Sequence, residues 1–234
     1  MNNICVVYGG NSKLINSLKN ELLELFDSII LISREQITDN SKNIKSIKYK
    51  EISDIEKQLK KYIKNSKIFY ISAAAFSSDK LFLNESNDSL NMSIQVNLTN
   101  NIKIIQMLMS ESVKHRNGTF VFISSFRADV PTRGTCIYSS SKKFVETLFS
   151  SLAIEYSLFN QRFLTLKIGL FESGLSSNLP FDIKSKKFLK NNLSTRRVST
   201  SKDIFSAIKF IYENEYINGT EIDMTGKLLL DLKL

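Results

Sequence analysis

Short apolar runs alternate along the chain with longer stretches in which apolar residues recur every three or four positions. Residues 4–8 form the first run, which is rich in β-branched side chains and ends at Gly9 and Gly10. Such continuous runs are typical of a strand buried on both faces of a sheet. With Asn11 or Ser12 as the expected cap, helical spacing follows in Leu14, Ile15, Leu18, Leu22 and Leu25. The pattern predicts one strand followed by one helix.

The alternation continues to the end of the chain. Strands are predicted over residues 28–32, 44–49, 68–71, 119–123, 163–168 and 228–230. Helices are predicted over residues 52–63, 94–109, 139–160 and 201–212. Strands and helices that alternate with short connections favour a single doubly wound α/β domain over residues 1–234, with a mostly parallel central sheet.

Two long stretches interrupt this alternation. Residues 76–92 are polar, and residues 172–200 contain Gly174, Pro180 and many basic side chains. Loops of this length inside an α/β domain are usually functional, and ligands of open α/β sheets bind at the carboxyl ends of the strands. We therefore expect residues 173–202, after the sixth strand, to form a substrate lid.

Composition narrows the class of protein further. The chain has two cysteines, Cys5 and Cys136, and one histidine, His115, which are too few for an ordinary zinc site. We expect no metal, no disulfide, and His115 at the surface before a turn. The cysteine usage and the lack of a secretory leader favour a cytoplasmic protein. No apolar run approaches the roughly 20 residues of a membrane helix, so no membrane partner is expected.

The charge balance raises two further possibilities. Among 234 residues, 32 are Lys or Arg and 23 are Asp or Glu, which gives a net charge of +9. Clustered lysines neutralise nucleic-acid phosphates, but most of this charge is dispersed and no recognised binding motif is present, so we expect no nucleic-acid partner. The densest basic run lies between Lys184 and Lys202 and contains no acid. It is either a solvated face or a field that steers an anionic substrate.

Tyr138 and Lys142 carry the clearest chemical signal. Their i, i+4 spacing at a predicted helix start places the phenol and the ammonium on one face. A nearby ammonium favours the phenolate, so Tyr138 would exchange a proton more readily than an isolated tyrosine. The pair alone also fits a solvated helix face. Ser125, at the end of the strand predicted over 119–123, would bring a hydroxyl beside the phenol, and this favours a catalytic site.

With these motifs, the chain resembles the short-chain dehydrogenase/reductase family over nearly its whole length. Residues 122–125 look like the family's strand-end serine motif, and residues 138–142 look like its Tyr-x-x-x-Lys motif. Residues 96–98 look like the helix segment that carries its catalytic asparagine, and residues 217–226 like its closing strand and glycine turn. The resemblance implies a Rossmann-type domain that reduces a ketone or aldehyde to an alcohol with a nicotinamide cofactor.

The resemblance also implies roles for four residues. Tyr138 would be the general acid, and Ser125 would hydrogen-bond the substrate carbonyl and stabilise the developing alkoxide. Lys142 would hold the nicotinamide ribose and depress the pKa of the tyrosine. Asn97 would order a water in the proton relay.

Cofactor binding rests on residues that only partly match the family. The expected set is Gly9, Gly10, Ser12, Lys13, Ser33, Arg34, Glu51, Ala73, Ala74, Tyr138, Lys142 and Gly169. The family's Thr-Gly-x-x-x-Gly-x-Gly aligns with residues 8–15, so Lys13 and Ile15 replace its second and third glycines. Lys13 would either pair with a cofactor phosphate or be solvated, whereas Ile15 would fill the core. Ser72 replaces an asparagine with which the family braces its central sheet.

The end of the second strand bears on the choice of nucleotide. NAD enzymes place a carboxylate there, on the ribose 2′-hydroxyl, but this chain has Ser33 followed by Arg34. A guanidinium accommodates a 2′-phosphate, so NADP(H) is favoured, with NAD(H) as the alternative because Glu35 adjoins. Glu51 looks like the family's adenine-side acid, but also fits a helix-entry glutamate.

The substrate and the assembly follow from the same resemblance. The substrate would be a small carbonyl or alcohol compound, and the basic lid favours an anionic one, such as a nucleotide-linked sugar or a carrier-bound acyl group. Family members assemble through two long helices, here residues 94–109 and 139–160, which implies a homodimer or homotetramer. The alternative, favoured by Lys13, Ile15 and Ser72, is a catalytically silent family member that binds a nucleotide or a partner protein.

Overall fold

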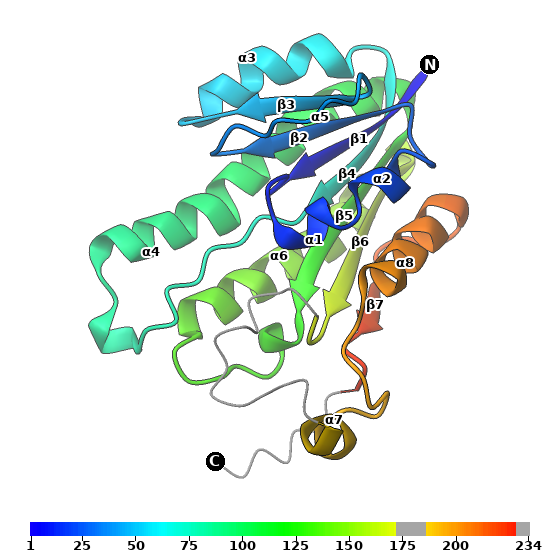
Figure 1. Ribbon diagram of the computed structural model, residues 1–234. Coiled ribbons are helices and arrows are strands. Elements are labelled where there is room, and N and C mark those ends of the chain that lie inside the picture. The colour runs from blue at the N-terminus through cyan, green and yellow to red at the C-terminus, as the bar shows by residue number, and fades with distance from the viewer. Residues whose placement is uncertain (172–185, 228–234) are drawn as a thin grey trace.

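A seven-stranded parallel sheet forms the centre of the part of the chain that the computed structural model describes, residues 1–171 and 186–227 (Figure 1). Its strands are β1 (Asn2–Tyr8), β2 (Ser28–Ser33), β3 (Ile44–Lys48), β4 (Ser66–Ser72), β5 (Gly118–Ser125), β6 (Gln161–Ile168) and β7 (Glu221–Met224). They lie in the order β3-β2-β1-β4-β5-β6-β7, and every neighbouring pair is parallel. This is the doubly wound α/β arrangement that the alternating pattern predicts.

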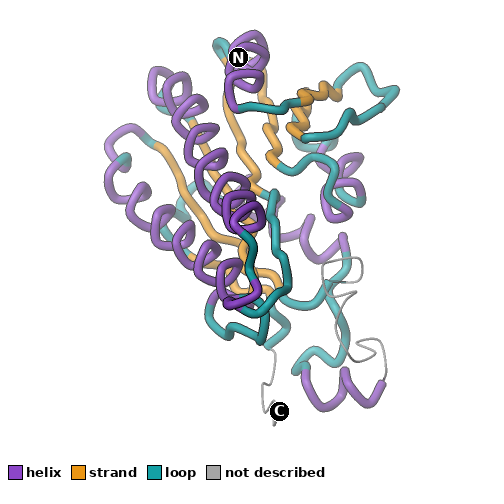
Figure 2. The backbone as a smooth tube through the Cα atoms, turned by 90° about the vertical axis from the view of Figure 1, so that its left-hand side faces the viewer, coloured by secondary structure: helices purple, strands orange, loops and turns teal. Residues whose placement is uncertain are grey.

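Helices cover both faces of the sheet (Figures 1 and 2). One face packs against α3 (Ile52–Ile63), α5 (Asn100–His115) and α6 (Cys136–Glu155), and the other against α1 (Lys13–Asn16), α2 (Lys19–Leu22) and α8 (Ser201–Glu213). A π-helical turn, Gln95–Thr99, joins α4 (Asn87–Ile94) to α5, and α7 covers Lys186–Asn192. The sheet is therefore buried on both sides.

Burial on both faces explains the continuous apolar runs of the strands. In β1, Ile4, Val6 and Tyr8 belong to the core beneath α3, α5 and α6, whereas Cys5 and Val7 belong to the core beneath α1, α2 and α8. Successive side chains of a strand point to opposite faces, so a strand between two helical layers needs apolar residues at every position.

The structure differs from the predicted elements at several ends. The first predicted helix divides into α1 and α2, because the Ser17 hydroxyl donates to the Leu14 carbonyl and the Leu18 amide bonds to Ile15, which tightens the chain. Its apolar face is nonetheless buried as predicted. The helix predicted from residue 94 begins at Asn87, inside the stretch expected to be irregular. The strand predicted over residues 228–230 lies outside the described residues.

Two glycines set the path of the chain from β1 into α1. Gly9 has a φ of +94°, and a Cβ there would lie 2.5 Å from the Ala74 backbone nitrogen. A Cβ on Gly10 would lie 2.7 Å from Leu31 Cβ. The backbone after β1 therefore passes directly against β2 and the loop after β4. This is the switch point of the sheet, where β1 lies between β2 and β4 and doubly wound sheets bind their ligands.

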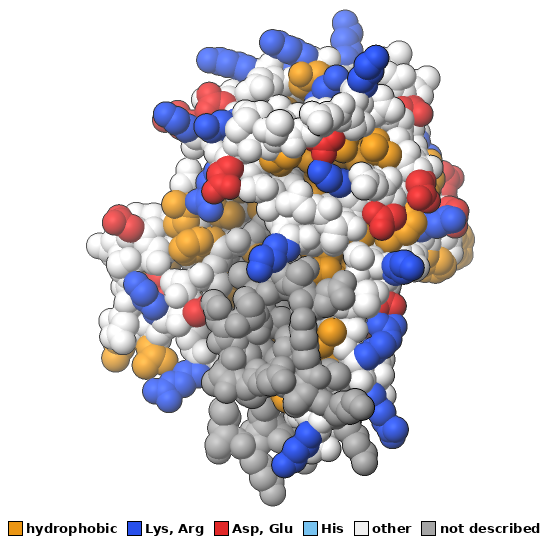
Figure 3. All heavy atoms as spheres, in the orientation of Figure 1, with side chains coloured by type: hydrophobic (Ala, Val, Ile, Leu, Met, Phe, Trp, Pro, Cys, Tyr) orange, Lys and Arg blue, Asp and Glu red, His pale blue; other side chains and the backbone are white. Residues whose placement is uncertain are grey.

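Charged side chains of both signs lie on the face shown in Figure 3, where Lys and Arg gather along the upper edge and are interspersed with Asp and Glu at the sides. His115 is the last residue of α5, and its ring lies 3.3 Å from the Glu111 carboxylate rather than fully in solvent. Within the described ranges, no helix combines the length and the apolar character that crossing a bilayer requires.

Candidate active site

A cavity of about 790 Å³ opens at the carboxyl ends of the strands. It collects most of the residues that the sequence singles out: Gly9, Ser12, Lys13, Ser33, Arg34, Ala73, Ala74, Ser125, Tyr138, Lys142 and Gly169. Gly10, Glu51 and Asn97 lie outside its lining. Cavities of this size hold drug-sized or larger ligands. Residues from both halves of the sequence therefore meet in one hollow.

Ser125 and Tyr138 lie at one end of this cavity. Ser125 is the last residue of β5, and Tyr138 lies in the first turn of α6. Burial raises the pKa of Tyr138, while a hydrogen bond with Ser125 and the charge of Arg127 act in the opposite direction. The phenol is therefore protonated at neutral pH, which differs from the sequence expectation of a depressed pKa.

Lys142 lies one helical turn from Tyr138 but points at the strand beneath it. Its ammonium donates to the Ile123 carbonyl at 2.8 Å and lies 4.6 Å from the centroid of the Phe122 ring, against 5.7 Å for the Tyr138 ring. Burial lowers the pKa of Lys142 to about 7, although Glu146 acts to raise it. The side chain therefore changes its charge near neutral pH.

Asn97 lies in the π-helical turn and braces two segments. Its amide oxygen accepts from the Phe76 backbone at 2.8 Å, and its amide nitrogen donates to the Phe76 carbonyl and to the Ser141 hydroxyl, both at 3.0 Å. π-Helical turns are frequent at functional sites. Here the turn ties the loop after β4 to α6, one residue before Lys142.

The other end of the cavity gathers charged side chains from the loops after β1 and β2. Arg34 donates to the Met92 sulfur at 3.1 Å, and the Asn11 amide donates to the Glu35 carboxylate at 2.7 Å. Lys13 is exposed and lines the cavity, whereas Ile15 is fully buried in the core as predicted.

Glu51 and Gly10 lie outside the cavity lining, at the start of a helix and against a strand. Glu51 precedes α3, where the Asp54 carboxylate accepts from the Lys50 and Glu51 amides at 3.0 and 3.1 Å. This is the helix-entry position that the sequence left open. Gly10 packs against Leu31, so its missing side chain serves the contact between the turn and β2.

Sequence reasoning missed several lining residues. Tyr8 and Tyr49 meet across the cavity wall, where the Tyr49 hydroxyl donates to the Tyr8 hydroxyl at 3.2 Å and Tyr8 donates to the Val96 carbonyl at 3.1 Å. Arg127 lines the cavity two residues after Ser125. Its position just past a strand end is the signal that could have found it.

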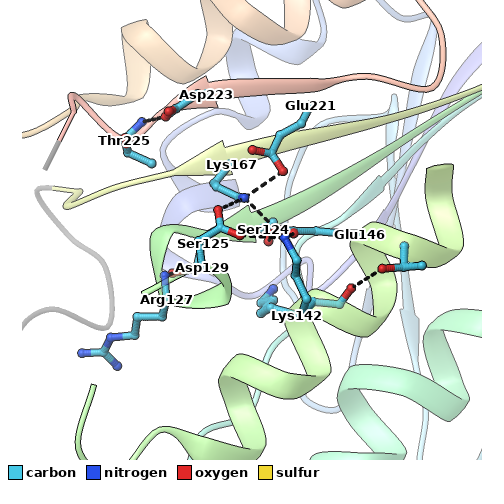
Figure 4. Close-up of polar contacts among 12 residues, drawn as sticks. Ser124, Ser125, Arg127, Asp129, Lys142, Glu146, Lys167, Glu221, Asp223 and Thr225 are labelled. Carbon is cyan, nitrogen blue, oxygen red and sulfur yellow. Dashed lines mark hydrogen bonds and ion pairs between the residues drawn. The ribbon is translucent and has the colours of Figure 1, made fainter. Parts of the chain in front are cut away.

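An ion cluster centred on a buried lysine lies next to Ser125 (Figure 4). The Lys167 side chain, 3% exposed, contacts the carboxylates of Asp129, of Glu146 at 3.3 Å and of Glu221 at 2.8 Å. Glu146 also accepts from the Ser124 hydroxyl at 2.6 Å. Burial acts to lower the pKa of Lys167, but its bonds with Asp129 and Glu221 raise it above the usual range. Lys167 is therefore charged at neutral pH.

The predicted lid is described only in part. Residues 172–185 lie outside the described residues, and so does Lys184 of the basic run. In the described part, Arg197 forms a bidentate pair with the Asp203 carboxylate at 2.6 and 2.7 Å. Asp203 follows the run by one residue, so this arginine is neutralised by the first turn of α8.

We expect Lys167→Met to lower the free energy of unfolding by about 2–3 kcal/mol, because it leaves the buried Glu146 carboxylate with a single cation, Lys143 at 3.0 Å, whose side chain is half exposed. Urea unfolding at neutral pH measures this change. Lys60→Met is the matched control, since Lys60 pairs with Glu56 on the exposed face of α3, where such pairs contribute under about 1 kcal/mol. Adding Glu146→Gln to Lys167→Met should restore part of the loss, and equal effects of the two lysine variants would contradict the role of the cluster.

We expect Lys142 to make stability depend on pH. With a folded pKa of about 7 and an unfolded value near 10.4, the unfolded chain binds the extra proton between these limits. Relative to Lys142→Met, the free energy of unfolding should therefore rise by about 2 kcal/mol between about pH 6.5 and 9. Lys143→Met is the control, because bonds with Asp129 and Glu146 raise the pKa of Lys143. A pH-independent difference for Lys142→Met would rule out the lowered pKa.

Comparison with known proteins places the chain in a family. A family model described as short chain dehydrogenase matches residues 9–182. The 3-oxoacyl-(acyl-carrier-protein) reductase FabG of Buchnera aphidicola subsp. Schizaphis graminum (strain Sg) is 28% identical over 165 residues, 68% of this chain and 66% of that protein. This chain therefore matches just under two thirds of that relative's length.

Solved structures agree on the fold. A 4-hydroxyisoleucine dehydrogenase complexed with NADH superposes with a TM-score of 0.85 at 20% identity, covering 96% of this chain and 98% of that one. ElxO with NADP bound superposes with a TM-score of 0.82 at 17% identity, covering 97% of this chain and 98% of that one. Since the family model also matches well over half of the sequence, the chain belongs to the short-chain dehydrogenase family.

Proposed function

We propose that the protein is an oxidoreductase that uses NADP(H) to reduce a ketone or aldehyde to an alcohol. The observation that supports this most directly is that Ser125, Tyr138 and Lys142 line one end of the same cavity whose other end holds Arg34 and Lys13. Their hydroxyl, phenol and amine groups are the kinds of group that a carbonyl reduction would use.

The residues at the switch point fit a nicotinamide dinucleotide. Gly9 brings its backbone so close to Ala74 that no side chain is tolerated, and Ala73 and Ala74 continue this small-residue wall. The cations Lys13 and Arg34 lie near the ends of β1 and β2, and the hydroxyl of Ser125 lies at the end of β5. When bound, the reduced cofactor would supply the hydride. The bound cofactors named for the two structural neighbours, NADH and NADP, support either nucleotide.

The protein's own groups would complete the reduction with a proton. Because burial raises the pKa of Tyr138, the phenol is protonated and suits a donor to the oxygen of a forming alkoxide. The Ser125 hydroxyl would hydrogen-bond the same oxygen and favour the developing charge. Lys142, with a pKa of about 7, can hold a proton near Tyr138 at neutral pH and would contact the cofactor ribose. Asn97 would hold α6 in place through its bond to Ser141, and it would order a water in the proton relay.

The preference for NADP(H) rests on Arg34. Its guanidinium makes only a weak contact, to a methionine sulfur, among the described residues, so it is available to a 2′-phosphate. Glu35 is the opposing feature, since its carboxylate favours a ribose hydroxyl, but it is already held by Asn11.

The assembly that we propose is a homodimer or homotetramer. Two large apolar side chains of α6, Phe144 and Ile154, are 49% and 78% exposed on its outer face. Apolar side chains on one helix support a contact with another subunit. The protein would be cytoplasmic.

Tyr138→Phe should lower kcat by at least about 100-fold, because it removes only the proton donor, and should leave cofactor affinity within about 3-fold. Steady-state reduction of a panel of carbonyl compounds measures the first effect, and fluorescence titration with NADPH the second. Tyr156→Phe, at the far end of α6, is the control and should leave kcat unchanged. Turnover in the Tyr138 variant equal to that of the native protein would contradict the role of Tyr138 as proton donor, and absence of turnover in the native protein would support the catalytically silent alternative.

Arg34→Ala should weaken NADPH binding by about 10- to 100-fold and NADH binding by less than about 3-fold, because only NADPH carries the 2′-phosphate. Calorimetric titration of both cofactors measures the two affinities. Lys13→Ala serves as the comparison: it weakens both cofactors alike if Lys13 pairs with the pyrophosphate, and neither if Lys13 is solvated. Equal losses for both cofactors on Arg34→Ala would overturn the assignment of Arg34.

A further inference from the structure

Arg127 is a cation in the cavity wall that the carbonyl chemistry above does not use. It lies in the 3₁₀ turn Phe126–Ala128, directly after Ser125, and its side chain is only 12% exposed. Among the described residues its guanidinium makes no side-chain hydrogen bond, and its one ion pair is a long one, 3.8 Å to the Asp79 carboxylate. A guanidinium carries five N–H donors, so most of its hydrogen-bonding capacity is left for a ligand.

The turn that carries Arg127 is held at both ends. The Arg127 amide donates to the Ser125 hydroxyl oxygen at 3.3 Å. Two residues later, Asp129 is bound by Lys143 at 2.6 Å and by Lys167. Figure 4 shows the Arg127 side chain pointing away from this cluster, so the acids that hold the turn do not neutralise the arginine. The backbone of Arg127 is therefore held next to Ser125, and the acid that pairs with its guanidinium among the described residues is Asp79, at 3.8 Å.

The charges that line the cavity favour a negative ligand. Arg127 and Lys142 are the charged lining residues near Ser125 and Tyr138, and the one acidic side chain of the described lining, Glu35, lies at the other end. A buried planar guanidinium pairs best with a carboxylate or phosphate, through two parallel hydrogen bonds. A neutral ketone would leave Arg127 with only its long ion pair to Asp79 among the described residues.

We propose that Arg127 is the anion receptor of the substrate site, so that the protein acts on carbonyl compounds that carry an anionic oxygen group within reach of the reacting carbonyl. This inference rests on the proposed carbonyl reduction and deepens it. The anionic charge is recognised by a residue of the β5 end, independently of the basic run after β6. Arg127 is a specificity-determining residue.

A matched pair of probes tests the proposal: acetoacetate, and its neutral methyl ester, methyl acetoacetate. Binding of each to the protein saturated with NADP is measured by calorimetry, and kcat/KM for each with NADPH. The native protein should prefer acetoacetate. Arg127→Met should reduce this preference, as a ratio of affinities and of kcat/KM, by about 10- to 100-fold, the scale of a lost charge-assisted pair. Arg127→Lys should retain part of it.

Arg133→Met is the matched control. Arg133 lies in the same connection between β5 and α6 but is exposed and does not line the cavity, so its removal should leave the preference unchanged. If the native protein shows no preference, or if Arg127→Met weakens both probes equally, the anion receptor is wrong. An equal loss together with a shifted pH profile of kcat would mean that Arg127 acts on Tyr138 instead.

The two proposals fail separately. Reduction of both probes without a charge preference would leave the carbonyl reductase standing and remove the anion receptor. Charge-selective binding that is lost in Arg127→Met, without reduction of any carbonyl compound, would leave the receptor standing and remove the proposed reaction.

Discussion

The pairing of one buried lysine with three carboxylates holds the reactive end of this protein together. Lys167 comes from β6, and its partners Asp129, Glu146 and Glu221 come from the segment after β5, from α6 and from β7. An ammonium removed from water needs close counter-charges, and the buried carboxylate of Glu146 needs a cation in return, whereas Asp129 and Glu221 reach Lys167 from the surface. Because the buried lysine binds acids from three segments, it links the segment after β5, α6 and β7 to β6. Ser125, Tyr138 and Arg127 take their positions from these segments.

Glu146 connects this ion cluster to the candidate catalytic residues. Its carboxylate binds Ser124 at 2.6 Å, next to Ser125, and lies one helical turn beyond Lys142. In the dry interior, burial pulls the pKa of Lys142 down while it pushes the pKa of Tyr138 up. The charges of Glu146 and Arg127 oppose these shifts. The pKa values of Lys142 and Tyr138 therefore depend on burial and on the charges of Glu146 and Arg127.

The nucleotide end shows how a departure from a familiar motif is absorbed by packing. Ile15 replaces a glycine of the family pattern, and its side chain is fully buried in the core beneath α1, α2 and α8. The close approach of backbone to backbone is retained at Gly9, against Ala74. Lys13 replaces the other glycine at an exposed position on the cavity rim. Of the three glycines in the family pattern, the fold therefore keeps Gly9, where a side chain would clash with the backbone, and it uses Ile15 to fill the core.

The sequence by itself determined the elements and their order, because burial on both faces forces continuous apolar strands and amphipathic helices, and these are local patterns. It also singled out Ser125, Tyr138 and Lys142 as candidates, since strand ends and i, i+4 spacing are local too, and the structure places these residues in one cavity. Only the tertiary structure decided that Lys142 points at Ile123, that Asn97 braces Phe76, and that Lys167 gathers acids from three distant segments. These contacts join residues up to 54 positions apart in the chain, as in Lys167 and Glu221, and no periodicity encodes such pairings. They depend on which strands become neighbours in the sheet.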